Sequence, residues 1–104
     1  MGADEVFAAL SDPTRREVLF LVAQGRAQTA TELAAALPVT RQAVAKHLAV
    51  LEDAQLVDAQ RAGRTMRFRA TPAPLAEAIV WMAEVGGQWD ERLDRLRVAA
   101  QNRA

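Results

Sequence analysis

Two short helical segments joined by three residues most constrain what this chain can fold into. The first reads TELAAAL, PVT follows it, and the second reads RQAVAKHLAVLEDA. Thr29 or Thr31 can cap the first helix and Pro38 ends it, while Thr40 is the natural N-cap of the second. A short helix, a turn of about three residues and a capped second helix form the signature of a helix-turn-helix.

The second helix has two unlike faces. Val44, Leu48 and Leu51 share one side and predict the buried face. The opposite side places long hydrogen-bonding side chains around the small Ala45, a pattern that suits close approach to the major groove of DNA. The predicted DNA contacts on this helix are Thr40, Arg41, Gln42, Ala45, Lys46 and His47. The alternative is a plain amphipathic helix with a solvated face.

After residue 56 the apolar period changes from that of a helix to that of a strand. LVDAQR, a turn at AGR and TMRFRA predict a two-stranded hairpin, with Gly63 permitting the tight turn. Met66 and Phe68 are expected to face the core. A hairpin directly after a recognition helix describes the wing of a winged helix, and its predicted DNA contacts are Arg61, Arg64 and Thr65.

The chain has no net charge, but its charges are unevenly distributed. Residues 41–69 contain six basic and three acidic side chains, a local charge of +3, whereas the flanks 1–40 and 70–104 carry −2 and −1. This local excess is the electrostatic pattern expected of a nucleic-acid interface. Chance clustering of surface charge is the alternative.

Composition argues against an enzyme or a cofactor protein. With no cysteine, a single histidine and no glycine-rich phosphate loop, we predict no catalytic residues, no metal site and no cofactor. His47 is expected either to pack as a hydrogen-bonded imidazole or to contact phosphate or a neighbouring helix. Because no apolar run approaches the roughly 18 residues of a membrane span, we expect a cytoplasmic protein.

The last helical segment carries a heptad seam of apolar and small residues. Leu75 and Ile79 are expected to pack on the chain's own core, and the rest of the seam needs a partner. Gly86-Gly87 is compatible with a close contact, a kink or a break between two helices.

These motifs together resemble the ArsR/SmtB family of bacterial winged-helix transcriptional regulators. FAALSDPTRREVLFLV resembles the family's opening helix pair, and the spacing V..HL..L from Val44 to Leu51 resembles its spine. The resemblance covers roughly residues 5–70, and PAPLAEAIVWMAEVGGQWDERLDRL is similar to a subgroup that binds no metal. Thr29 and Thr31 stand where metal-sensing members carry cysteine, so the resemblance implies DNA binding and dimerisation through the first and last helices without that metal site. The dimer interface that the resemblance implies consists of Val6, Phe7, Leu10, Met82, Trp89, Leu93 and Leu96.

The sequence therefore predicts a mainly α protein with a small β-hairpin, a winged helix-turn-helix of five helices and a two-stranded wing. Residues 1–104 are expected to form one DNA-binding domain with N- and C-terminal dimerisation helices. The expected function is that of a homodimeric repressor that binds double-stranded DNA at a palindromic operator, one recognition helix per half-site. The alternative is a helical protein-interaction module that does not bind DNA. A small-molecule effector stays open.

Overall fold

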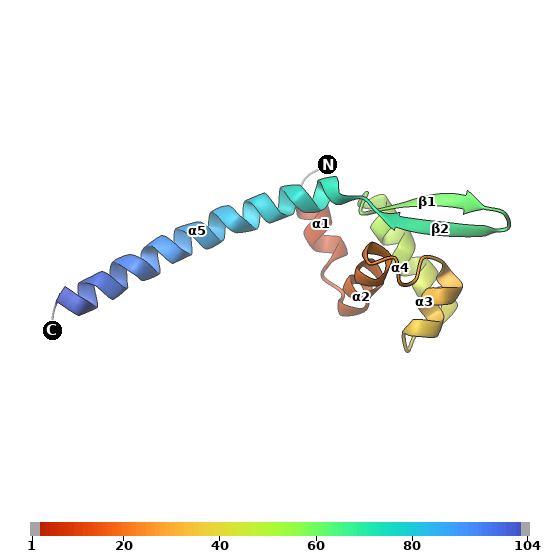
Figure 1. Ribbon diagram of the computed structural model, residues 1–104, viewed down its shortest axis with the longest axis horizontal. Coiled ribbons are helices and arrows are strands. Elements are labelled where there is room, and N and C mark those ends of the chain that lie inside the picture. Colours follow the sequence, from red (N-terminus) through yellow and green to blue (C-terminus); the bar gives the residue numbers. More distant parts are fainter. Residues whose placement is uncertain (1–2, 103–104) are drawn as a thin grey trace.

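The computed structural model describes residues 3–102, without the side chains of residues 88–90, 93 and 102. Within that range the chain forms five helices and one antiparallel hairpin, which confirms the predicted fold class (Figure 1). The elements in order are α1 (Ala3–Ala9), α2 (Pro13–Ala23), α3 (Ala30–Ala36), α4 (Arg41–Asp53), β1 (Val57–Ala62), β2 (Thr65–Ala70) and α5 (Pro72–Asn102).

Side-chain caps set where the helices of the motif begin. Thr40 accepts a hydrogen bond from the backbone N–H of Ala43 and caps α4, as predicted. Thr29, rather than Thr31, caps α3 in a reciprocal arrangement with Glu32, in which each side chain accepts from the other residue's backbone N–H. These caps satisfy backbone donors at both helix starts and fix the length of the turn between them.

A small apolar core holds α1 to α4 together. Val6, Val18, Leu33, Val44, Leu51 and Leu56 are the largest fully buried side chains, and each of the first four helices contributes at least one. Burying a side chain of this size contributes roughly 1.5–3 kcal/mol to stability. No charged or polar residue is buried in the core of the described part of the chain. The orientation of α4 is therefore set by apolar packing of one of its faces.

The hairpin forms the predicted wing. Its strands pair from Val57 with Ala70 to Ala62 with Thr65, and Gly63 in the turn has a φ of 65°. Phe68 packs against the core as expected, but Met66 does not: it is 39% exposed. Met66 lies opposite Arg61, one pair from the last pair of the hairpin, and the tip of the hairpin extends beyond the helices (Figure 1).

Helix α5 runs unbroken through Gly86 and Gly87 and projects far from the rest of the chain (Figure 1). The molecule measures 68 × 29 × 20 Å, and its radius of gyration is 18.8 Å, compared with about 13 Å for a compact chain of 100 residues. Leu75, near the start of α5, packs on the core, and Trp81, further along the helix, meets Phe7 of α1 edge to face with the ring centroids 5.5 Å apart. None of the described helices is both long and apolar enough to cross a membrane.

The face of α5 that packs on the core is not centred on the predicted seam. Ile79, expected in the protein's own core, is 58% exposed, whereas its neighbour Ala78 is 2% exposed and Trp81, further along, still meets Phe7 of α1. A heptad seam marks which residues of a helix are apolar, but it does not settle which of them face the body of the chain.

The end of α4 provides a test of backbone strain. Gln55 has a φ of 60°, in the left-handed region that favours glycine, and Gly25 holds the equivalent place after α2 with a φ of 70°. We expect Gln55→Gly to raise the free energy of unfolding by about 0.5–1 kcal/mol. Gly25→Ala, the matched control, should lower it by about 1 kcal/mol. Chemical denaturation at one protein concentration measures both, and a loss of stability in Gln55→Gly would contradict the account.

The cap of α3 provides a test of pH dependence. The backbone N–H of Gln28 and the Thr29 side chain bond the Glu32 carboxylate and hold the pKa of Glu32 below its ordinary 4.5. A depressed pKa means that the ionised group stabilises the fold above the unfolded value, and that this contribution is lost as pH falls through the folded value. Glu32→Gln should therefore lower the melting temperature at pH 7, and its difference from the parent should shrink below pH 4.5. Glu17→Gln on α2 is the control, and a pH-independent difference for Glu32→Gln would refute this assignment.

Candidate nucleic-acid interface

The exposed face of α4 carries the predicted recognition residues. Thr40, Arg41, Gln42, Ala45 and Lys46 are all exposed, whereas Val44, Leu48 and Leu51 on the opposite side are buried. Because the buried face packs against the core, α4 is fixed in its rotation and its long polar side chains point into solvent. The small side chain of Ala45 lies between them, and it lets the helix backbone come close to the floor of a DNA groove.

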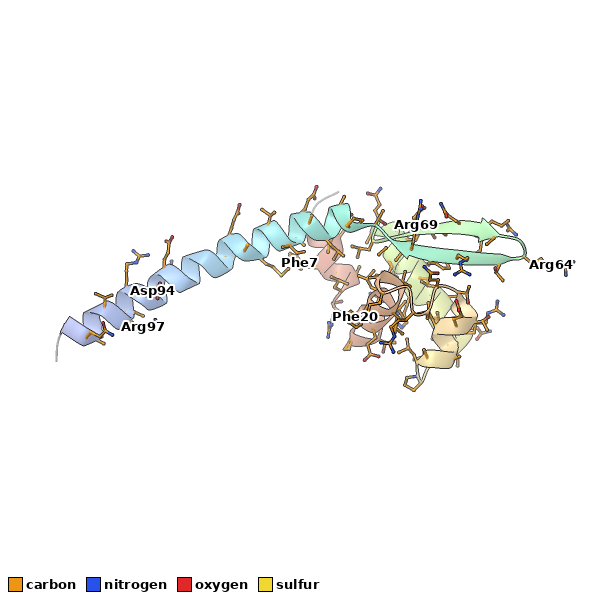
Figure 2. The ribbon with its side chains drawn as sticks, in the orientation of Figure 1. Phe7, Phe20, Arg64, Arg69, Asp94 and Arg97 are labelled. Carbon is orange, nitrogen blue, oxygen red and sulfur yellow. The ribbon has the colours of Figure 1, made fainter. Side chains whose placement is uncertain are left out.

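The tip of the wing presents a second set of polar residues. Arg61, Arg64 and Thr65 are exposed, and Figure 2 shows Arg64 at the end of the ribbon. The Thr65 hydroxyl donates to the carbonyl oxygen of Ala62 at 2.9 Å and closes the turn. Its oxygen can still accept a hydrogen bond, but its proton is used within the hairpin.

The six basic side chains of residues 41–69 fall into two groups. Arg67 donates to the side chain of Gln28 at 2.5 Å, and Arg69 pairs with Asp58 at 3.3 Å. Within residues 3–102, the side chains of the other four make no hydrogen bond or ion pair: Arg41, Lys46, Arg61 and Arg64. Four cations, on the exposed face of α4 and at the wing tip, are therefore available to an anionic partner.

His47 lies at the edge of the buried face of α4. It is half-buried, and its Nδ1 atom has no hydrogen-bond partner among the described residues. The pKa of Asp12, the N-cap of α2, is lowered chiefly because the backbone N–H of Arg15 donates to its carboxylate, and nearby His47 contributes a smaller electrostatic effect. His47 thus lies near the start of α2, a neighbouring helix, as one of the alternatives raised by the sequence has it, but its Nδ1 forms no hydrogen bond with the described residues.

The predicted dimer residues divide between the core and the surface. Val6 is 1% exposed and belongs to the protein's own core, so its assignment to a dimer interface is wrong. Phe7 and Leu10 are half-buried and pack against that core. Met82 and Leu96 on α5 are exposed, and the side chains of Trp89 and Leu93 lie outside the described residues.

Gln28 is a site residue that the sequence analysis missed. It lies between α2 and α3, and it contacts the wing 39 residues further along the chain through Arg67. No local pattern of charge or hydropathy distinguishes this glutamine from any other loop residue. Gln28 meets strand β2 only because the fold places that strand beside the loop before α3.

The described residues contain no group of three or more histidine, cysteine or acidic side chains placed to hold a metal ion. A cavity of about 500 Å³ lies where the end of α4 meets β1 and the start of α5. Its lining includes Glu52, Asp58 and Glu77. Three carboxyl groups disfavour the phosphates that nucleotide cofactors carry.

The chain matches the model of a protein family described as helix-turn-helix domain over residues 10–60. It is 30% identical to the transcriptional repressor SdpR of Bacillus subtilis (strain 168) over 90 residues, which cover 86% of this chain and 99% of the relative.

Among solved structures, an ArsR-like transcriptional regulator from Rhodococcus sp. RHA1 superposes with a TM-score of 0.73 at 42% identity, covering 91% of this chain and 89% of the other. A homodimeric winged helix-turn-helix DNA-binding domain from Mycobacterium bovis, described as a possible ArsR-family regulator, gives 0.64 at 25% identity, covering 82% and 78%. These relatives are transcriptional regulators and not enzymes. The chain belongs to the ArsR family of transcriptional regulators with a helix-turn-helix DNA-binding fold.

Proposed function

We propose that this protein is a homodimeric repressor that binds a palindromic operator, with one recognition helix in each half-site. The observation that carries the proposal is the division of the basic side chains: four without a partner in the described fold lie on α4 and at the wing tip, and the other two are bonded internally. The proposal takes residues 1–104 as one DNA-binding domain that acts in the cytoplasm of a bacterial cell.

In this proposal α4 enters the major groove. Arg41 and Gln42 reach base edges, because arginine bonds guanine and glutamine bonds adenine in two places, each pair discriminating by roughly 1–3 kcal/mol. Lys46 neutralises phosphate as a point charge, and Ala45 allows the close approach. Thr40 at the start of α4 and His47 at its edge border the groove.

The wing contacts the DNA beside the recognition helix. Arg61, Arg64 and Thr65 reach the flanking backbone or the minor groove, so they add affinity and register more than sequence discrimination. Figure 1 supports separate surfaces for DNA and for the second protomer, since the wing and the helix-turn-helix lie on one side of the molecule and the projecting part of α5 on the other.

The homodimer is supported by the exposed apolar side chains of α5. Met82 is 47% and Leu96 67% exposed on a helix that no other part of the described chain covers beyond its first turns. A second copy packed along α5, with Phe7 and Leu10 of α1 beside it, would remove this surface from water. A two-fold axis would then place two recognition helices one DNA turn apart, roughly 34–36 Å.

Repression is supported by the similarity to SdpR, a transcriptional repressor that the chain covers almost completely. A dimer bound across a promoter would exclude the polymerase. A small-molecule effector that releases it is compatible with this arrangement, but no lining residue identifies its chemistry. The competing function is an interaction module that uses the α5 face alone.

Binding of purified protein to labelled DNA from upstream of its own gene, against random DNA across a salt series, tests the proposal. Selective binding with a log–log salt slope of several units is expected, since each phosphate contact contributes about −0.9. Equal and weak binding to both DNAs at every salt concentration would favour the interaction module.

Removal of two unpaired cations should weaken DNA binding without affecting assembly. We expect the double variant Lys46→Ala/Arg64→Ala to lose roughly 2 kcal/mol or more of selective binding energy and about four units of salt slope, because each bound dimer loses two cations from each protomer. Arg95→Ala, on the distant part of α5, is the control. The proposal would be refuted by a double variant that dissociates into monomers yet keeps parental DNA affinity.

Charges placed on α5 should separate the protomers. The double variant Met82→Glu/Leu96→Glu is expected to sediment as a monomer, because each buried carboxylate costs several kcal/mol. Met66→Glu, at an exposed methionine on the wing, is the matched control and should remain dimeric. Unchanged sedimentation of the α5 variant would show that this face is not the interface.

A further inference from the structure

Gln28 joins the wing to the helix-turn-helix through two hydrogen bonds. Its side-chain Oε1 accepts from Nη2 of Arg67 at 2.5 Å, and its backbone carbonyl accepts from the N–H of Phe68 at 2.8 Å. Both partners belong to β2, and a residue in the loop before α3 thereby holds two successive residues of the wing.

The position of Gln28 is itself fixed from the other side. Its backbone N–H donates to the carboxylate of Glu32 at 3.1 Å, and the same carboxylate accepts the N–H of Thr29 in the cap of α3. Glu32 also feels the charge of Arg67, which helps to keep the pKa of Glu32 low. A continuous set of polar contacts therefore runs from the start of α3 to the middle of β2.

We propose that Gln28 is a positioning residue for DNA binding, which sets the angle of the wing to the recognition helix by clasping Arg67. In this role Arg67 is a structural partner of Gln28 and not a phosphate contact. The inference rests on the proposed function, because it assigns how the wing tip is placed against DNA.

The geometry of the wing explains why a side-chain contact at this place can affect its tip. A two-stranded ribbon is only marginally stable by itself and twists readily. Phe68 packs against the core, but Met66 and the tip beyond it are exposed. Arg64, in the turn, lies three positions before Arg67, a distance of about 10 Å or less at roughly 3.3 Å per residue. A small rotation at the clasp is therefore magnified at the tip.

The two roles of Arg67 predict opposite consequences for the loss of the Gln28 side chain. If Arg67 bound phosphate, Gln28→Ala would release its guanidinium and leave DNA binding unchanged or stronger. If Arg67 serves the clasp, Gln28→Ala removes an uncharged group but still weakens binding, because the tip arginines lose their placement. The backbone bond from Gln28 to Phe68 survives in either case, so the wing stays folded.

The DNA experiment compares Gln28→Ala, Arg67→Met and their double variant with the parent on the same operator. We expect each single variant to lose affinity about three- to tenfold. The double variant should lose no more affinity than the single variant that binds DNA less tightly. Gln60→Ala, on the strand opposite Arg67, is the control for Gln28→Ala and should bind as the parent does. Parental affinity in Gln28→Ala, or additive losses in the double variant, would overturn the clasp.

A measurement without DNA separates the clasp from the proposed function. Heteronuclear NOE values of the amides of residues 61–66 in the free protein should fall in Gln28→Ala and stay at parental values in Gln60→Ala. Unchanged values in Gln28→Ala would refute the clasp even if DNA binds selectively. If the values fall but the parent shows no selective DNA binding, the proposed function and the role of Gln28 in DNA binding both fail, while the clasp itself stands.

Discussion

Burial of one face of α4 is the constraint on which the rest of this structure depends. Val44 and Leu51 are completely buried and Leu48 almost so, and they hold α4 against the helices that precede it. Because that face cannot leave the core without exposing apolar surface, the opposite face must point outward. The presentation of Arg41, Gln42 and Lys46 is thus a consequence of packing, and no direct interaction is needed to orient them.

The basic side chains differ in whether they are bonded within the fold. A neutral chain becomes a candidate for nucleic-acid binding only because its cations are unevenly placed and unevenly partnered. Arg67 and Arg69 are consumed by Gln28 and Asp58 within the fold, and the unpaired cations gather on the recognition helix and wing tip. The far end of the molecule is apolar instead. There α5 exposes apolar side chains on the part of the helix that extends beyond the rest of the chain.

Most of the fold followed from local signals in the sequence, while the errors arose where distance along the chain was large. Caps such as Thr40 and the turn at Gly63 act on immediate neighbours, so their outcome could be read from a few residues. Periodicity identified the apolar faces of α1, β2 and α5 but not what covers them: Val6 is in the core, whereas Met66 and Ile79 are exposed. Gln28 could not have been found, because its partner Arg67 is adjacent only in the folded chain.

The central claim is that two outward-facing α4 helices, related by a two-fold axis, read DNA together. Selection of bound sequences from a random DNA pool by the purified protein tests it most directly. The account predicts inverted half-sites whose centres lie one helical turn, about 34–36 Å, apart. Enrichment of no sequence, or of a single half-site without an inverted partner, would contradict it.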